Sequence, residues 1–140
     1  MRKILYSPGY GAGWTSWEGN QEVKKFMLEY KPFIDYLEGG GKFEFDDAVA
    51  KEIDRLSERI ITDVRISKDF GMEFHWERME RNIPPLVFQF ARECYDRFKT
   101  IPFLGGLEEL KVKEVQGRVR IEDYDGFESI EEEGDFNEWL

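Results

Sequence analysis

The chain has 140 residues, a net charge of −10, and twelve Phe, six Tyr and four Trp. This length suits one domain, and there is no run of about 18 apolar residues and no signal-peptide pattern, so we expect neither a membrane protein nor a secreted one. With one cysteine, Cys94, and one histidine, His75, the chain cannot form an internal disulfide or a zinc site of His and Cys ligands.

The negative charge is concentrated near the end of the chain. Residues 121–140 contain nine acidic residues and no basic one, whereas the other 120 residues carry 21 acidic and 20 basic side chains. A protein that binds the phosphate backbone of DNA or RNA needs a basic surface. We therefore expect no nucleic-acid polymer as a partner, and we define residues 131–140 as the acidic tail.

The first predicted element is a strand over residues 3–7, which a glycine-rich stretch follows at residues 9–13. Alternate glycines let a backbone turn sharply and bring its N–H groups close to an anion, so Gly11 is a candidate phosphate contact. The G-x-G-x-G spacing, with no clear parallel strand after it, is a poor match to a dinucleotide-binding turn. A tight connection packed on the core by its tryptophans is the simpler interpretation.

A helix is predicted over residues 21–38. Its start has two candidate caps: Thr15 with Glu18, in the spacing of a capping box, and Asn20. Apolar side chains recur every three or four residues with an interruption at Pro32, so we expect one amphipathic helix that is kinked there and faces the sheet. A run of three glycines ends the pattern.

Residues 46–99 predict a helical hairpin that is inserted into a single domain of residues 1–140. Asp46 or Asp47 can cap the first helix, whose apolar positions recur over four to five turns. The pair Pro84-Pro85 opens the second helix, since proline is tolerated in the first turn. No second domain core covers these apolar stripes, so we expect the hairpin to pack on a partner subunit and the protein to form homo-oligomers.

The last part of the chain predicts a three-stranded antiparallel meander over residues 110–115, 118–122 and 127–130. In the middle strand, Val119 and Ile121 point to one face, and an Asp-Gly turn precedes the last strand. The whole pattern predicts an α+β fold, in which residues 2–7 and 110–130 form a small antiparallel sheet that the helix over residues 21–38 covers. The helical hairpin is expected either to project from this sheet or to pair with another copy of the chain and mediate oligomerisation.

Arg118 and Arg120 lie one strand position apart beside alternating carboxylates, and two interpretations are open. They can form cross-strand ion pairs on a solvated face, or they can present guanidinium groups to phosphate oxygens. Aromatic residues in predicted loops, such as Phe103, offer flat faces for a base. Glycine N–H groups, arginines and aromatic faces together indicate a nucleotide-like small molecule as the ligand.

Catalytic chemistry has little support in the sequence. No serine lies on a G-x-S-x-G elbow, and Cys94 falls on an apolar helical stripe, where a thiol is more often inert than activated. Asp123, Asp125 and Glu128 form an acidic cluster that could hold Mg²⁺ or Ca²⁺, but a turn beside a strand accounts for it and its spacing does not match an EF-hand loop. We expect no enzyme activity, no cofactor and no metal site.

Two motifs are distinctive as a pair: Ser7-Pro8-Gly9-Tyr10-Gly11-Ala12-Gly13-Trp14 and Arg120-Ile121-Glu122-Asp123-Tyr124-Asp125-Gly126-Phe127-Glu128-Ser129. The pair resembles small proteins of tailed phages and prophages that carry a GAGW loop near the start and an R-I-x-x-Y-D-G segment near the end. The chain is similar to the anti-Thoeris phage proteins, sponges that sequester cyclic ADP-ribose isomers made by a bacterial immune system. The resemblance covers the two ends of the chain, and residues 44–99 do not match it.

This resemblance implies a phage anti-defence protein of the host cytoplasm. It would bind a cyclic ADP-ribose isomer, or a related cyclic oligonucleotide, without cleaving it. The ligand-binding residues that we expect, chosen by their chemistry, are Gly11, Trp14, Phe103, Arg118, Arg120, Asp123 and Tyr124. The alternative function is that of a protein–protein inhibitor whose acidic, aromatic tail binds a basic host or defence protein, and it follows from the charge of the last 20 residues.

Overall fold

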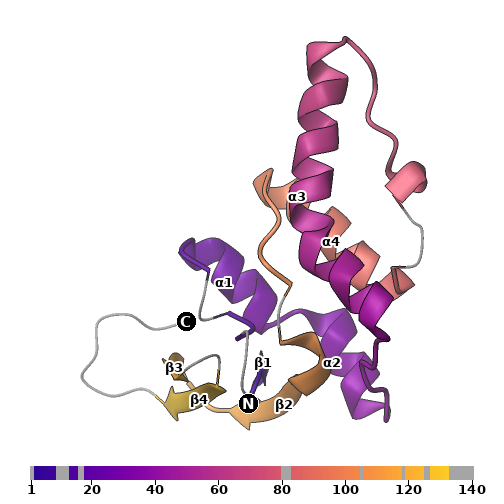
Figure 1. The fold of residues 1–140 in the computed structure, drawn as a ribbon. Coiled ribbons are helices and arrows are strands. Elements are labelled where there is room, and N and C mark those ends of the chain that lie inside the picture. The colour runs from indigo at the N-terminus through magenta and orange to yellow at the C-terminus, as the bar shows by residue number, and fades with distance from the viewer. Residues whose placement is uncertain are drawn as a thin grey trace. The chain divides into compact units, whose positions relative to one another are not determined.

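The structure is a computed structural model that describes residues 2–8, 13–15, 18–79, 83–104, 106–117, 119–124 and 127–132. Residues 79, 120, 122–124, 127 and 131–132 are described by their backbone alone. In chain order the elements are β1 (Arg2–Tyr6), α1 (Gln21–Leu28), α2 (Lys31–Glu38), α3 (Asp47–Asp69), the 3₁₀ turn η1 (Trp76–Met79), α4 (Pro85–Phe98), the 3₁₀ turn η2 (Leu107–Glu109), β2 (Lys111–Val115), β3 (Val119–Tyr124) and β4 (Phe127–Glu132) (Figure 1). The predicted α+β class, with antiparallel strands and helices, is confirmed.

The chain forms two compact units. Unit 1 consists of residues 1–44 and 105–140, and unit 2 consists of residues 45–104. In sequence, unit 2 is therefore inserted into unit 1, and it contains the stretch 46–99 that the sequence predicts as an insertion. None of the helices in the described part of the chain is long and apolar enough to cross a membrane.

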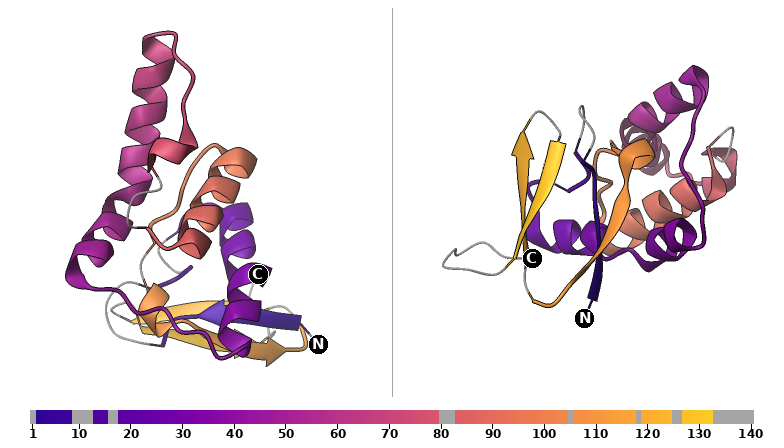
Figure 2. Two further views of the ribbon diagram at one scale, coloured as in Figure 1. Left: turned by 90° about the vertical axis from the view of Figure 1, so that its right-hand side faces the viewer. Right: turned by 90° about the horizontal axis from the view of Figure 1, so that it is seen from below.

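Unit 1 holds two antiparallel strand pairs, β1–β2 and β3–β4 (Figure 2). The first pair runs in register from Arg2↔Val115 to Tyr6↔Lys111, and the second from Val119↔Glu132 to Tyr124↔Phe127. The predicted three-stranded meander is therefore wrong, because β2 pairs with the N-terminal strand and not with β3. Alternation along a strand indicates which residues share a face, but it does not indicate which neighbour supplies the hydrogen bonds.

The strands of unit 1 share a core with α1. Ile4 of β1, Leu28 of α1, Val115 of β2 and Val119 of β3 form a buried cluster, against which Ile121 and Ile130 pack. Val119 and Ile121 thus face the same side, as their alternation predicts. Burying one such aliphatic side chain contributes about 1.5–3 kcal/mol, so the cluster contributes to the stability of this unit.

The single helix predicted over residues 21–38 is wrong, because α1 ends at Leu28 and α2 begins at Lys31. The chain between them turns at Tyr30, whose backbone is extended with φ −65° and ψ 102°. Pro32 lies in the first turn of α2, where its missing N–H group leaves no hydrogen bond unmade. In one continuous helix, the proline ring would clash with the carbonyl group of Leu28 and remove a hydrogen bond, so the chain starts a second helix instead.

Asn20 caps α1. Its side-chain oxygen accepts hydrogen bonds from the backbone N–H groups of Glu22 at 2.9 Å and Val23 at 3.1 Å. The carboxylate of Glu18 accepts a hydrogen bond from the backbone N–H of Asn20 at 3.1 Å. The capping box of Thr15 with Glu18 is therefore wrong, and the alternative cap at Asn20 is confirmed.

Unit 2 is built on α3, a helix of 23 residues. It begins after Asp46, whose carboxylate accepts a hydrogen bond from the N–H of Val49 at 2.8 Å, which is one of the two caps that the sequence predicts. The buried residues of α3 are Ile53, Leu56 and Ile60, all in its first two thirds. α4 lies along the N-terminal part of α3, and the C-terminal part of α3 extends beyond it (Figure 1, Figure 2).

α4 begins at Pro85, as the proline pair predicts. Its buried face consists of Val87, Phe88, Phe90, Ala91 and Cys94. The connection from α3 to α4 adds an aromatic contact, since Trp76 of η1 packs edge-on against Phe88, with 5.9 Å between ring centroids, and against Tyr95 at 5.6 Å. Edge-to-face aromatic pairs of this kind add about 0.5–1.5 kcal/mol to the stabilisation from burial.

Candidate functional site

The glycine-rich stretch connects the end of β1 to the segment before α1. Residues 9–12, Gly11 among them, lie outside the described residues, whereas both flanks of the stretch are described. Ser7 on one flank and Thr15 on the other are buried, with 0% and 1% of their surface exposed. The chain is therefore buried on each flank of the stretch, at Ser7 and at Thr15.

Glu128 of β4 binds the backbone on both flanks. Its Oε1 accepts a hydrogen bond from the N–H of Ser7 at 2.8 Å, and its Oε2 accepts one from the N–H of Thr15 at 2.9 Å. The backbone N–H of Glu128 donates to the carbonyl oxygen of Ser7 at 2.8 Å. Hydrogen bonds to a carboxylate are roughly twice as strong as neutral ones. One residue therefore ties both flanks of the glycine-rich stretch to the C-terminal hairpin, which consists of β3 and β4.

The position of Glu128 is unusual for an acidic residue, because only 1% of its surface is exposed. A buried carboxylate is costly unless it is hydrogen-bonded, and the two N–H groups of Ser7 and Thr15 offset that cost. On β4, Glu128 shares a face with Ile130, which packs against the core of unit 1. An acidic residue at an inward-facing strand position is the signal in the sequence that could have identified this contact.

Two buried hydroxyl groups lie near the same carboxylate. Within the described part of the chain, neither Oγ of Ser7 nor Oγ1 of Thr15 has a hydrogen-bond partner. The N–H of each residue binds Glu128, so each hydroxyl lies within about 6 Å of the carboxylate by covalent geometry. A buried hydroxyl without a partner costs roughly 1–3 kcal/mol. Such groups are usually satisfied by water or by a ligand, which makes this polar cluster a candidate site.

Trp14 is a core residue. Only 1% of its surface is exposed, and its indole N–H donates to the carbonyl oxygen of Met27 at 2.9 Å. Its ring lies 5.7 Å from that of Phe33. The ring has no exposed face on which a base could stack, so we assign Trp14 to packing instead of the ligand contact expected from the sequence.

The other expected ligand residues are distributed over both units. Arg118 lies outside the described residues, and Arg120, Asp123 and Tyr124 lie in β3, with Glu131, Glu128 and Phe127 as their cross-strand partners. Phe103 belongs to unit 2, and 42% of its surface is exposed. The register brings Asp123 opposite Glu128, so the end of the second motif lies beside the flanks of the glycine-rich stretch.

Three residues form the acidic cluster, Asp123, Asp125 and Glu128. Asp125 lies outside the described residues, and Asp123 is described by its backbone alone. Both carboxylate oxygens of Glu128 accept hydrogen bonds from backbone N–H groups. Across the residues whose side chains are described, no group of three His, Cys, Asp or Glu side chains is placed to hold a metal ion. For Glu128, the observed role is to position backbone.

Comparison with protein-family models gives no match for this chain. Searches of curated proteins and of solved structures find no similar protein either. A function can therefore be inferred only from the residues of the chain and from the contacts between them.

Proposed function

We propose that the protein binds a cyclic nucleotide signal, such as a cyclic ADP-ribose isomer, and sequesters it without cleaving it. The observation that carries this proposal is the pair of hydrogen bonds from Ser7 and Thr15 to Glu128. Through them, the two motifs that resemble those of the phage sponges meet in unit 1, although they lie at opposite ends of the chain. A ligand site made from both motifs is then sterically reasonable.

The ligand class follows from the residue types in these motifs. A cyclic ADP-ribose isomer carries a diphosphate and an adenine face. The N–H group of Gly11 and the guanidinium groups of Arg118 and Arg120 suit the phosphate oxygens. Tyr124 is an aromatic candidate in the same unit for stacking on the adenine, and Asp123 can accept a hydrogen bond from a ribose hydroxyl or from the adenine amino group.

The proposal is tested by ligand retention. The protein is incubated with a panel of cyclic ADP-ribose isomers and cyclic oligonucleotides, separated from free ligand and heat-denatured, and the released material is analysed. We expect intact ligand from the wild type and binding weaker by about tenfold to a hundredfold for Arg120→Ala, because one charge-assisted hydrogen bond contributes roughly 1.5–3 kcal/mol. Lys113→Ala, which removes the same charge from an exposed position of β2, is the matched control and should bind as the wild type does.

Two outcomes would contradict sequestration. A chemically altered product would identify an enzyme, and failure to retain any cyclic nucleotide would end the proposal. The second outcome would favour the protein–protein inhibitor, which the nine acidic residues in positions 121–140 support. For an inhibitor, removal of residues 131–140 should abolish activity, and binding should weaken with salt as the Debye length falls below about 10 Å.

We also propose self-association through the C-terminal end of α3. Ile66, Phe70 and Met72 are 43%, 75% and 60% exposed, and all three lie at or just after the last turn of the helix. Apolar side chains that gather in this way commonly mark a contact between proteins. Light scattering at micromolar concentration should give at least the mass of a dimer, and Phe70→Glu should give a monomer. A monomeric wild type would contradict this proposal.

A further inference from the structure

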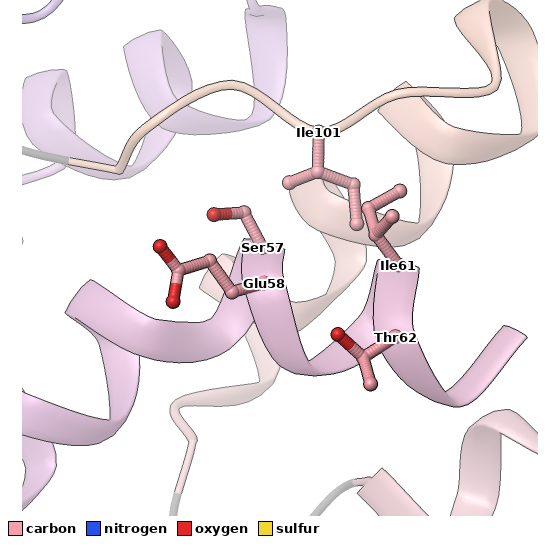
Figure 3. Close-up of a pocket in the computed structure, with 5 residues that line it drawn as sticks. All are labelled: Ser57, Glu58, Ile61, Thr62 and Ile101. Atoms are coloured by element: carbon pink, nitrogen blue, oxygen red, sulfur yellow. The ribbon is translucent and has the colours of Figure 1, made fainter. Parts of the chain in front are cut away.

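A depression of about 400 Å³ lies on unit 2, between α3 and the segment that follows α4. Its lining consists of Ser57, Glu58, Ile61, Thr62 and Ile101 (Figure 3). The volume falls within the range of about 300–1,000 Å³ that small-ligand sites occupy. The depression belongs to unit 2 alone and uses none of the residues of the proposed nucleotide site, so the inference below does not depend on that function.

The lining combines an apolar wall with a group of oxygen atoms. Ile61 of α3 and Ile101 point toward each other, and Ile61 is 39% exposed (Figure 3). The hydroxyl of Ser57 and the carboxylate of Glu58 lie to one side of this pair in the same view. None of the ion pairs formed among the described residues uses Glu58. An acceptor with a negative charge is therefore available beside two aliphatic side chains.

We propose that this depression binds an amphipathic cation, with an alkylammonium or alkylguanidinium group. The aliphatic part of such a ligand covers Ile61 and Ile101, and its charged end reaches the carboxylate of Glu58. The hydroxyl groups of Ser57 and Thr62 supply further acceptors for the remaining N–H groups. Lysine and arginine side chains divide their contacts in this way, with an apolar stem and a polar head.

Electrostatics favours a cation over an anion at this place. Glu58 is the charged member of the lining, so the charge of the depression itself is negative. A negative field raises the local concentration of cations and speeds their association. The same chemistry is available from two sources, namely a lysine or arginine side chain of a partner protein and a free polyamine.

The experiment uses the full chain labelled with ¹⁵N and two probes: spermidine, and an acetylated, amidated Gly-Lys-Gly peptide. Amide chemical shifts are followed during titration with each probe. We expect concentration-dependent shifts that centre on residues 57–62 and on Ile101. Tighter binding of spermidine would identify a free polyamine as the ligand. Tighter binding of the peptide would identify a lysine or arginine side chain of a partner protein.

Three variants test the assigned contacts. Glu58→Gln keeps the shape of the side chain but removes its charge, and should weaken binding by about fivefold, the equivalent of roughly 1 kcal/mol for an exposed ion pair. Ile61→Ser should also weaken binding, because it removes half of the apolar wall. Glu73→Gln makes the same charge change at an exposed position outside the depression and should leave binding unchanged.

Either of two results would overturn the inference. Equal weakening by Glu58→Gln and Glu73→Gln would mean that the probes respond only to the overall negative charge. Shifts that are absent from residues 57–62, or that are confined to the acidic tail, would mean that the depression is not the binding place. A folded spectrum for each variant ensures that lost binding is not lost structure.

Discussion

The carboxylate of Glu128 holds the backbone of Thr15, which lies 113 positions earlier in the chain, through a hydrogen bond of 2.9 Å from the Thr15 N–H. The other carboxylate oxygen accepts the N–H of Ser7 at 2.8 Å. Both flanks of the glycine-rich stretch thus depend on one side chain of the last described strand.

Replacing Glu128 by glutamine should destabilise the protein. The amide group has one acceptor oxygen, so one of the two N–H groups would face an NH₂ donor and remain unpaired in a buried position. We expect the free energy of unfolding to fall by about 2–4 kcal/mol, measured by urea denaturation. Glu109→Gln, at an exposed position of unit 1, is the control and should change stability by less than about 0.5 kcal/mol. Equal stability of the two variants would mean that the contact with Glu128 contributes little.

Replacing Thr15 by valine should stabilise the protein, in contrast to the change at Glu128. Valine has nearly the same shape and keeps the N–H group that binds Glu128, but it lacks the buried hydroxyl that has no described partner. We expect the free energy of unfolding to rise by up to about 1 kcal/mol in urea denaturation. Thr100→Val, at an exposed position, should have little effect. A clear loss of stability in Thr15→Val would show that the hydroxyl binds a partner such as a buried water molecule.

Trp14→Phe separates a core role from a ligand role. The change removes the hydrogen bond to Met27 and leaves space beside Phe33, so we expect a loss of about 2–4 kcal/mol in thermal or urea unfolding. Because the Trp14 ring is buried, the folded variant should retain any bound nucleotide with nearly the affinity of the wild type. A variant that stays folded and stable but loses the ligand would contradict the assignment to the core.

Lys3 gives a pH-dependent prediction. Its ammonium group donates a hydrogen bond of 2.7 Å to Glu38, and this bond together with the negative charge of Glu38 raises the pKa of Lys3 above its ordinary value of 10.5. Because the raised pKa belongs to the folded state, the stabilisation is complete below pH 10.5 and is lost as the pH rises through the raised pKa. The wild type should therefore be more stable than Lys3→Met at neutral pH, by a small amount because the pair is exposed.

Thermal unfolding of both proteins between about pH 8 and pH 12 measures this effect. The difference in unfolding temperature should shrink over the alkaline part of the range. Lys113→Met, at an exposed position of β2, should show no such trend relative to the wild type. A difference between wild type and Lys3→Met that stays constant up to the highest pH would contradict the ion pair with Glu38.

Local features of the fold could be predicted from the sequence because their causes lie within a few residues. The cap of α3 at Asp46 acts on Val49, and the start of α4 at Pro85 follows from the geometry of proline itself. The shared face of Val119 and Ile121 follows from the two-residue period of a strand. For the candidate site, the residue types in the sequence suggest two kinds of phosphate contact. These are the glycine N–H groups near the start of the chain and Arg118 and Arg120 near its end.

Only the tertiary structure decided how these pieces meet. The pairing of β2 with β1, the burial of Trp14 and the binding of Ser7 and Thr15 by Glu128 all join residues that are far apart in the chain or depend on what packs around them. Spacing along the sequence carries no information about such partners, because many strand pairings satisfy the same alternation. An acidic residue is ordinarily expected at the surface, and Glu128 is buried because two backbone N–H groups from the other end of the chain replace its water.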